Sequence, residues 1–206
     1  MRKTAQIVFA AFCMMVMAPF AASSAETNLK QAEEYVRTLG NEAVGLLQAS
    51  DDKNGERQLA IRNMLKDNLA LERISRIIYG RGWRSATEDE RKEYQSLFNE
   101  YILSKYTYLI GGYSGETFKV MGSQPAGRSD ALVRTAILKD GQTSATVDWR
   151  ITEEGPKLAI LDVKIEKSSM VQTEKSQFQA VLSKEGHAGL VKALQQQIDR
   201  LHEKKE

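Results

Sequence analysis

The spacing of apolar residues gives the first third of the chain a helical pattern. From Leu29 to Leu47, apolar side chains recur every three or four residues, which is the period of an amphipathic helix. Stretches with the same period run from 59 to 65 and from 69 to 78, and the polar turn 50–55 precedes them. We therefore predict three helices before Gly80.

The longest predicted helix begins at Thr87. Thr87 and Glu90 have the spacing of a capping box, in which the hydroxyl and the carboxylate each accept a bond from a free backbone N–H. A stripe of apolar and aromatic residues continues from there to Leu109. Gly111 and Gly112 follow the stripe and end the predicted helix.

Beyond residue 112 the apolar period changes from four to two, which indicates β-strands. The predicted strands are 117–121, 131–138, 143–151 and 158–165. Asp140 and Gly141 form a hairpin turn signal between the second and third strands. Pro125 and Pro156 are expected in Gly-bearing turns. Consecutive strands joined by short turns predict a four-stranded antiparallel sheet with one buried face.

Helical spacing returns after Met170 and predicts a short helix around Phe178 and a last helix over 190–201. The order of elements is therefore helices, then a sheet, then helices. This order is typical of an α+β domain in which the helices pack on one face of the sheet.

The N-terminus has the pattern of a secretory signal peptide. Arg2 and Lys3 precede an apolar run over 7–20, and small residues follow at 23–25. The run is shorter than the roughly 20 residues of a membrane span, although a retained anchor is the alternative. We predict a signal over 1–25, cleaved near Ala25, and a single domain over 26–206. This domain would comprise a helical part (28–112), the sheet (117–165) and C-terminal helices (172–204).

Composition excludes some classes of protein. The chain has 29 Lys and Arg residues against 27 Asp and Glu, and the excess of two is Arg2 and Lys3. Without the leader the formal charge is zero, whereas a nucleic-acid-binding protein normally has a basic excess. The single cysteine, Cys13, also lies in the leader, so the mature chain has no disulfide.

Residues that could carry catalysis are sparse. His187 and His202 have no metal-site spacing and are expected to be solvated surface side chains. No serine lies in a nucleophile-elbow motif, and no glycine-rich segment has phosphate-loop spacing. Asp148 and Asp162 are the strand carboxylates that an enzyme could use. The prediction is a protein that is not an enzyme, with no catalytic residue, metal or cofactor and no visible headgroup clamp.

Aromatic residues are dense between 79 and 118. Tyrosine combines an apolar body with a polar tip, which suits the wall or mouth of an apolar pocket. The same residues would also serve as ordinary core and surface aromatics.

Several separate blocks resemble the MlaC/toluene-tolerance family of periplasmic lipid carriers. The segment YGRGWRSATEDERKEY at 79–94 is similar to the family's LGRYWRKATPEQRQEF. The matched positions are Gly80, Arg81, Trp83, Arg84, Ala86, Thr87 and Arg91. Similar elements are the YSG turn at 113–115, VDWR at 147–150, the DVKIEKSSMVQ block at 162–172 with SQF at 176–178, and KxGxxxL at 184–190. Gly82, Leu158, Lys164 and Ser168 depart from common family residues.

The resemblance implies a nuclear-transport-factor-like or cystatin-like sheet that encloses an apolar lipid cavity with its helices. It implies a monomeric periplasmic carrier without stable membrane insertion. Such a carrier would exchange phospholipid with an inner-membrane ABC transporter complex and an outer-membrane lipoprotein complex. A hopanoid or another hydrophobic lipid is the alternative cargo, and a periplasmic protein-binding module or an enzyme of the same fold is the alternative function.

If the resemblance holds, acyl chains would contact apolar residues on the buried faces of the predicted helices and strands. The predicted lining residues are Trp83, Phe98, Tyr101, Ile102, Tyr106, Leu109, Val147, Trp149, Ile151, Val163, Ile165, Met170 and Val171.

Overall fold

The computed structural model describes residues 20–48, 55–111 and 115–203, with side chains from Asn28 onward. The helices are α1 (Phe20–Gln48), α2 (Glu56–Asn68), α3 (Leu71–Tyr79), the 3₁₀ turn η1 (Gly80–Arg84), α4 (Glu88–Ile110) and α5 (Met170–Glu203). The strands are β1 (Thr117–Ala126), β2 (Asp130–Lys139), β3 (Gln142–Glu154), β4 (Lys157–Ile165) and β5 (Ser168–Ser169). Most of the expected leader, 1–25, lies outside the described residues, so its cleavage stays a prediction.

The strands form one antiparallel sheet in the order β1-β2-β3-β4-β5. The predicted α+β class and antiparallel meander are confirmed, and the fifth strand is a two-residue addition after β4. Asp140 and Gly141 both have positive φ, 52° and 77°, as the two central residues of a type I′ turn require.

Strand β1 is longer than the sequence pattern predicts. Its register shifts between Val120 and Gly122, and pairing with β2 then continues to Ala126. The bulge reverses the alternation of side chains, which conceals the second half of the strand from a period-two pattern. The expectation of Pro125 in a turn is wrong: it pairs with Ala131 on an edge strand, which is where a sheet tolerates proline.

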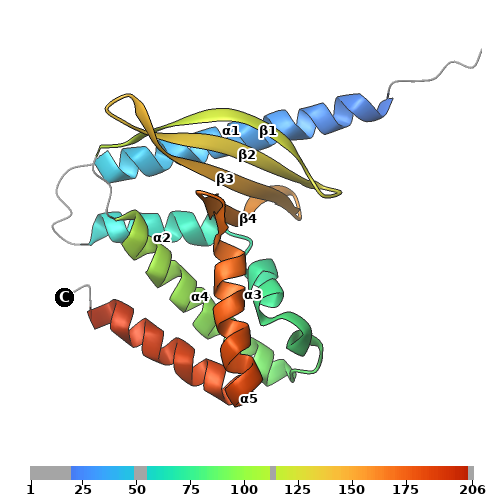
Figure 1. Ribbon diagram of the computed structural model, residues 1–206, viewed down its shortest axis with the longest axis vertical. Helices are drawn as coiled ribbons and strands as arrows, with labels where there is room; N and C mark the ends of the chain where they lie inside the picture. Colours follow the sequence, from blue (N-terminus) through green and yellow to red (C-terminus); the bar gives the residue numbers. More distant parts are fainter. Residues whose placement is uncertain (1–19, 49–54, 112–114, 204–206) are drawn as a thin grey trace, which may run out of the picture.

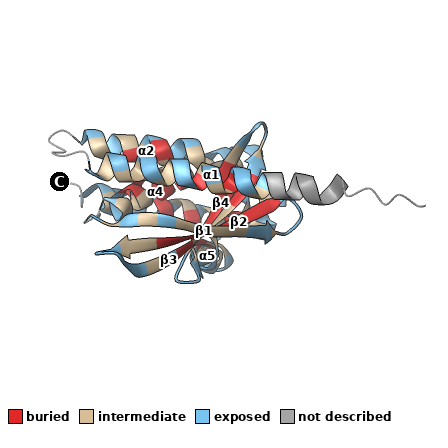
Figure 2. Ribbon diagram, turned by 90° about the horizontal axis from the view of Figure 1, so that it is seen from above, coloured by how far each residue is buried: buried red, intermediate tan, exposed pale blue. Residues whose placement is uncertain are grey.

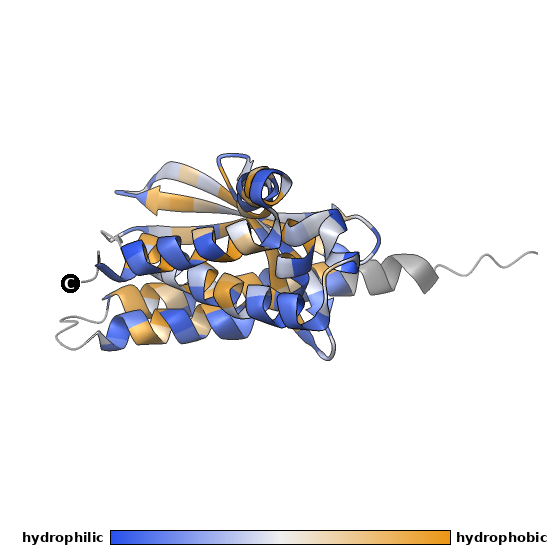
Figure 3. Cartoon of the chain, turned by 90° about the horizontal axis from the view of Figure 1, so that it is seen from below, coloured by the Kyte–Doolittle hydropathy of each residue, from blue (hydrophilic) through white to orange (hydrophobic). Residues whose placement is uncertain are grey.

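The helices are arranged in two groups around the sheet (Figure 1). Helix α1 lies along the sheet, whereas α2, α3, α4 and α5 form a bundle below it. Figure 2 shows the buried positions where strands and helices meet, with exposed hairpin tips outside them. Figure 3 shows the amphipathic helices, which carry hydrophobic and hydrophilic positions on different sides.

Helix α1 approaches the sheet closely at Gly40. A Cβ atom at this position would overlap the ring of Phe118 on β1. The absence of a side chain therefore permits the contact between α1 and the sheet edge, although glycine is a weak helix former.

Helix α5 consists of two helices that meet at Gly186, whose φ of 67° and ψ of −163° are not helical. The predicted pair of C-terminal helices is thus present, joined by a kink without an intervening loop. In Figure 1 the first half descends from the sheet and the second half returns beside α4. The second half buries Leu190, Leu194 and Ile198 and closes this side of the bundle.

Candidate functional site

Strand register places five of the predicted lining residues on one face of the sheet. Val147 pairs with Ile165, and Trp149 pairs with Val163. Ile151 follows Trp149 by two residues and therefore shares its face. The Trp149 indole Nε1 donates a hydrogen bond of 2.9 Å to the Thr135 hydroxyl on the adjacent strand, which fixes the ring against this face.

Burial on this face decreases across the sheet, from β2 through β3 toward the last residues of β4. Ile151 and Val133 are fully buried, and Val147 is 5% exposed. Trp149 and Val163 are half-buried, whereas Ile165 is 54% exposed. One end of the apolar face therefore belongs to the core, and the other end continues to the surface.

Helix α4 shows the same gradient. Tyr94, Phe98 and Ile102 are fully buried. Further along the helix, Tyr106 is half-buried and Leu109 is 57% exposed. We call the exposed or half-buried apolar residues at these ends of the sheet face and of α4 the open end. It comprises Trp149, Val163 and Ile165 on the sheet and Tyr106, Leu109 and Ile110 on α4.

An aromatic cluster fills the opposite, closed end of the bundle. Tyr94 contacts Tyr79, Phe98 and Phe178, with ring centroids 4.8, 5.6 and 6.4 Å apart. Trp83 joins the cluster at 6.2 Å from Tyr94. The resemblance to the family at 79–94 therefore coincides with a packing motif here.

Arg91 holds the η1 turn against α4. Its Nε donates to the Trp83 carbonyl at 2.9 Å, and its guanidinium lies over the Trp83 ring, 5.5 Å from the centroid. The capping box is also present: the Glu90 N–H donates to the Thr87 hydroxyl at 3.2 Å, and the Thr87 N–H donates to the Glu90 carboxylate at 2.7 Å. These bonds lower the pKa of Glu90.

A charged network lies between the open and closed ends. Glu174 on α5 is fully buried and accepts hydrogen bonds from the Lys105 ammonium at 2.5 Å, from the Tyr101 hydroxyl at 3.1 Å and from the Tyr106 hydroxyl at 3.3 Å. The Lys105 side chain is 26% exposed. Burial, and then the Glu174 charge, raises the pKa of Tyr106. We call these four residues the Lys105–Glu174 network.

The thirteen predicted lining residues thus fall into several groups, and Tyr106 belongs to two of them. Trp83 and Phe98 belong to the closed aromatic cluster, while Tyr101 and Tyr106 bind the carboxylate of Glu174. Ile102, Ile151 and Met170 are buried in the core. Val147, Trp149, Val163, Ile165, Tyr106 and Leu109 border or form the open end, and Val171 is half-buried at the start of α5.

Lys105 and Glu174 are site residues that were not predicted from the sequence. Glu174 lies four residues before Phe178 and four after Met170, so it occupies the apolar stripe of α5. This position was the available signal for a buried carboxylate.

The two strand carboxylates have structural partners. Asp148 accepts two bonds from the Arg134 guanidinium, at 2.7 and 3.0 Å, and these bonds lower its pKa. Asp162 accepts from the Ser169 hydroxyl at 2.6 Å and from the Val171 N–H at 3.1 Å, at the start of α5. Both carboxylates are therefore engaged in strand and helix-end contacts.

The expectation of solvated histidines is wrong for His187. Its side chain is 15% exposed, with Nδ1 3.1 Å from the Tyr79 hydroxyl and Nε2 3.3 Å from the Glu93 carboxylate. These partners lie about a hundred residues earlier in the chain, beyond the reach of local spacing. His202 is 53% exposed and lies 3.4 Å from the Glu100 carboxylate.

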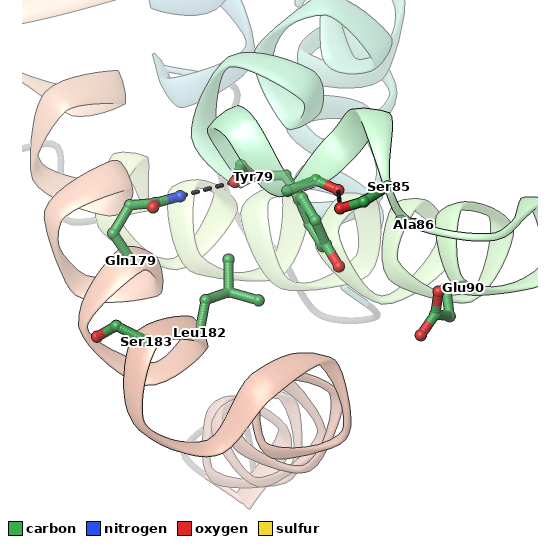
Figure 4. Close-up of a pocket in the computed structure, with 8 residues that line it drawn as sticks. Tyr79, Ser85, Ala86, Glu90, Gln179, Leu182 and Ser183 are labelled. Atoms are coloured by element: carbon green, nitrogen blue, oxygen red, sulfur yellow. Dashed lines mark hydrogen bonds between the residues drawn. The ribbon is translucent and has the colours of Figure 1, made fainter.

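A cavity of about 320 Å³ lies between η1, the start of α4 and the first half of α5. Figure 4 shows Gln179, Leu182 and Ser183 on one side and Ser85 and Glu90 on the other. The Gln179 amide donates to the Tyr79 carbonyl at 2.7 Å. A second cavity, of about 110 Å³, lies between the start of α1 and the β1–β2 turn. Both are separate from the open end.

Within residues 28–48, 55–111 and 115–203, no group of His, Cys, Asp and Glu side chains could hold a metal ion. None of the described helices is long and apolar enough to cross a membrane.

Comparison with known proteins agrees with the resemblance. The model of the family described as MlaC protein matches residues 37–196. The chain belongs to the MlaC family. A solved phospholipid-binding protein from Ralstonia solanacearum, in complex with a phospholipid, is 21% identical to it with a TM-score of 0.73. The match covers 83% of this chain and 98% of that chain, and it shows a shared fold.

The match to the MlaC family model spans most of the site described above. Residues 37–196 contain the Gly40 contact, all of α4 and the sheet, and α5 beyond its kink. The open end, the Lys105–Glu174 network and the closed cluster therefore all lie within the matched segment.

Proposed function

We propose that this MlaC-family protein is a periplasmic lipid carrier whose open end holds acyl chains between the sheet and α4. The observation that carries the proposal is the apolar sheet face that runs from the fully buried Ile151 to the 54% exposed Ile165. Exposed apolar surface that continues from a core is typical of sites for a protein partner, a membrane or an apolar ligand. The phospholipid bound by the Ralstonia solanacearum protein of the same fold supports this class of ligand.

The energetics of acyl chains suit a shuttle. Each methylene group removed from water contributes about 0.8 kcal/mol, so two chains of about 16 carbons gain roughly 25 kcal/mol over water. The same chains gain almost nothing over a bilayer, which is equally apolar. Transfer therefore requires a docking partner, and we propose an inner-membrane ABC transporter complex and an outer-membrane lipoprotein complex.

Phospholipid is the proposed cargo, and a hopanoid is the alternative cargo. A role as an enzyme is disfavoured because Asp148 and Asp162 are engaged by Arg134, Ser169 and the start of α5. A protein-binding role would use the same open end with a peptide in place of a lipid.

A charge on the apolar face tests the proposal. Val147→Glu places a carboxylate at a position that is 5% exposed, whereas Ser144→Glu places one at an exposed position of the same strand. We expect Val147→Glu to abolish uptake of phospholipid from vesicles and Ser144→Glu to leave it unchanged. Circular dichroism must show that both variants are folded. Full lipid uptake by folded Val147→Glu would contradict the proposed site.

A further inference from the structure

We infer that the Lys105–Glu174 network ends the acyl-chain site on its inner side and sets the length of chain that the protein accepts. This inference rests on the proposed function and adds a specificity-determining element to it. The open end alone would leave the inner limit of the site undefined.

The order of side chains along α4 supports the inference. Tyr94 and Phe98 belong to the closed aromatic cluster, Lys105 belongs to the network, and Leu109 lies at the open end. With a rise of 1.5 Å per residue, Phe98 and Leu109 are about 16 Å apart along the helix axis. The network therefore separates two apolar regions of one continuous stripe.

Aromatic rings pack directly on the closed side of the network, and the cavity of about 320 Å³ beside Tyr79 is lined by none of these rings. Phe178 lies 6.1 Å from Phe98 and 5.8 Å from Tyr101, measured between ring centroids. Phe98 is fully buried and Phe178 is 6% exposed. A chain that passed the network would have to displace these rings.

The polar groups of the network oppose passage of a methylene chain. Glu174 accepts three hydrogen bonds, one of them within its ion pair with Lys105. An acyl chain inserted between these groups would break these bonds. Leaving a buried charge without its partner costs more than burying a few methylene groups contributes. Acyl chains are therefore expected to stop on the Tyr106 side.

A third element adds a polar group at this level. The Asp162 carboxylate on β4 binds the Ser169 hydroxyl and the Val171 N–H, and its charge contributes to the raised pKa of Tyr106. The Tyr106 hydroxyl thus binds the Glu174 carboxylate on α5 and also senses the charge of Asp162 on β4. The polar boundary includes the sheet as well as the two helices.

Photocrosslinking of the wild-type protein tests the boundary directly. The probe is a phosphatidylcholine with a diazirine at the end of one acyl chain, loaded from vesicles. We expect crosslinks within 103–110 and 145–165. Crosslinks within 91–98 or 175–182, or a probe that reacts only with solvent, would overturn the inference. Failure of the wild type to take up any lipid would instead refute the proposed function.

A chain-length competition tests the same point with a variant. Tyr101→Phe, Lys105→Met, Tyr106→Phe and Glu174→Met together remove the polar groups and keep apolar volume. The protein is equilibrated with vesicles of phosphatidylcholines that differ by two methylenes per chain. Each methylene that the wild type excludes should lower the relative affinity for that lipid about fourfold. The quadruple variant should lose this preference for shorter chains.

Lys92→Met is the matched control, because Lys92 is an exposed lysine of the same helix that pairs with Glu88. It should retain the wild-type preference. An unchanged chain-length preference in the folded quadruple variant would overturn the inference. Should that variant not fold, the crosslinking result on the wild type decides the question.

Discussion

Removing the ammonium group of Lys105 should destabilise the fold strongly. Glu174 is fully buried, and Lys105 is its one charged partner among the hydrogen bonds described. Breaking a buried ion pair from one side typically costs 3–5 kcal/mol. Because the Lys105 side chain is 26% exposed, we expect the lower end of the range, about 3 kcal/mol, for Lys105→Met.

Urea denaturation at neutral pH measures this loss. With an m-value of about 2 kcal/mol per M, the unfolding midpoint should fall by about 1.5 M. The double variant Lys105→Met/Glu174→Met removes both charges and should recover most of the loss, because a buried pair can be replaced by apolar residues at little net cost. The exposed pair of Lys92 and Glu88 gives the control: Lys92→Met should cost less than about 0.5 kcal/mol.

The reasoning fails if Lys105→Met shifts the midpoint no further than Lys92→Met does. It also fails if the double variant is less stable than Lys105→Met, since the uncompensated carboxylate would then not be the source of the loss.

Three further variants test other parts of the account. Gly40→Ala should lower the free energy of unfolding by about 1–3 kcal/mol because its Cβ overlaps a ring on β1, whereas Gly45→Ala, with open space around it, should raise it by up to about 1 kcal/mol; thermal melts compare the two, and equal shifts would contradict the close contact. Thr87→Ala should cost about 1 kcal/mol through loss of the capping box, measured by the same melts, with no change expected in lipid uptake. Asp148→Asn should flatten the loss of stability below about pH 4: the Arg134 bonds lower the folded-state pKa, so their stabilisation is present above the unfolded pKa and is lost as pH falls through the folded value. An acid limb identical to that of the wild type would contradict this last prediction.

Much of the fold follows from local patterns. The capping box at Thr87, the type I′ turn at Asp140 and the shared face of Val147 and Trp149 each depend on residues close together in the chain. Local chemistry is sufficient for such features because the bonds that define them span only a few residues.

The features that the sequence did not reveal depend on distant residues. The partners of His187, Tyr79 and Glu93, lie about a hundred residues away. In the sequence, Glu174 only interrupts an apolar stripe, because its partner Lys105 lies on a different helix, α4. The second half of β1 is concealed by a bulge, since one extra residue inverts the alternation of side chains.

The position of the predicted lining residues shows the same limit. Apolar periodicity identifies side chains that avoid water, but it does not separate a core from a ligand site. Trp83 and Leu109 have similar apolar character, yet Trp83 packs in the closed cluster and Leu109 is 57% exposed. The gradient of burial along α4 and the sheet provides that distinction.

Native mass spectrometry of the mature protein, purified from periplasm without detergent and then extracted with organic solvent, tests the central claim most directly. The account predicts a mass increment that matches a phospholipid and disappears on extraction. A mass increment that matches a hopanoid would support the carrier function with a different cargo. A ligand-free mass, together with no uptake from added vesicles, would contradict the account.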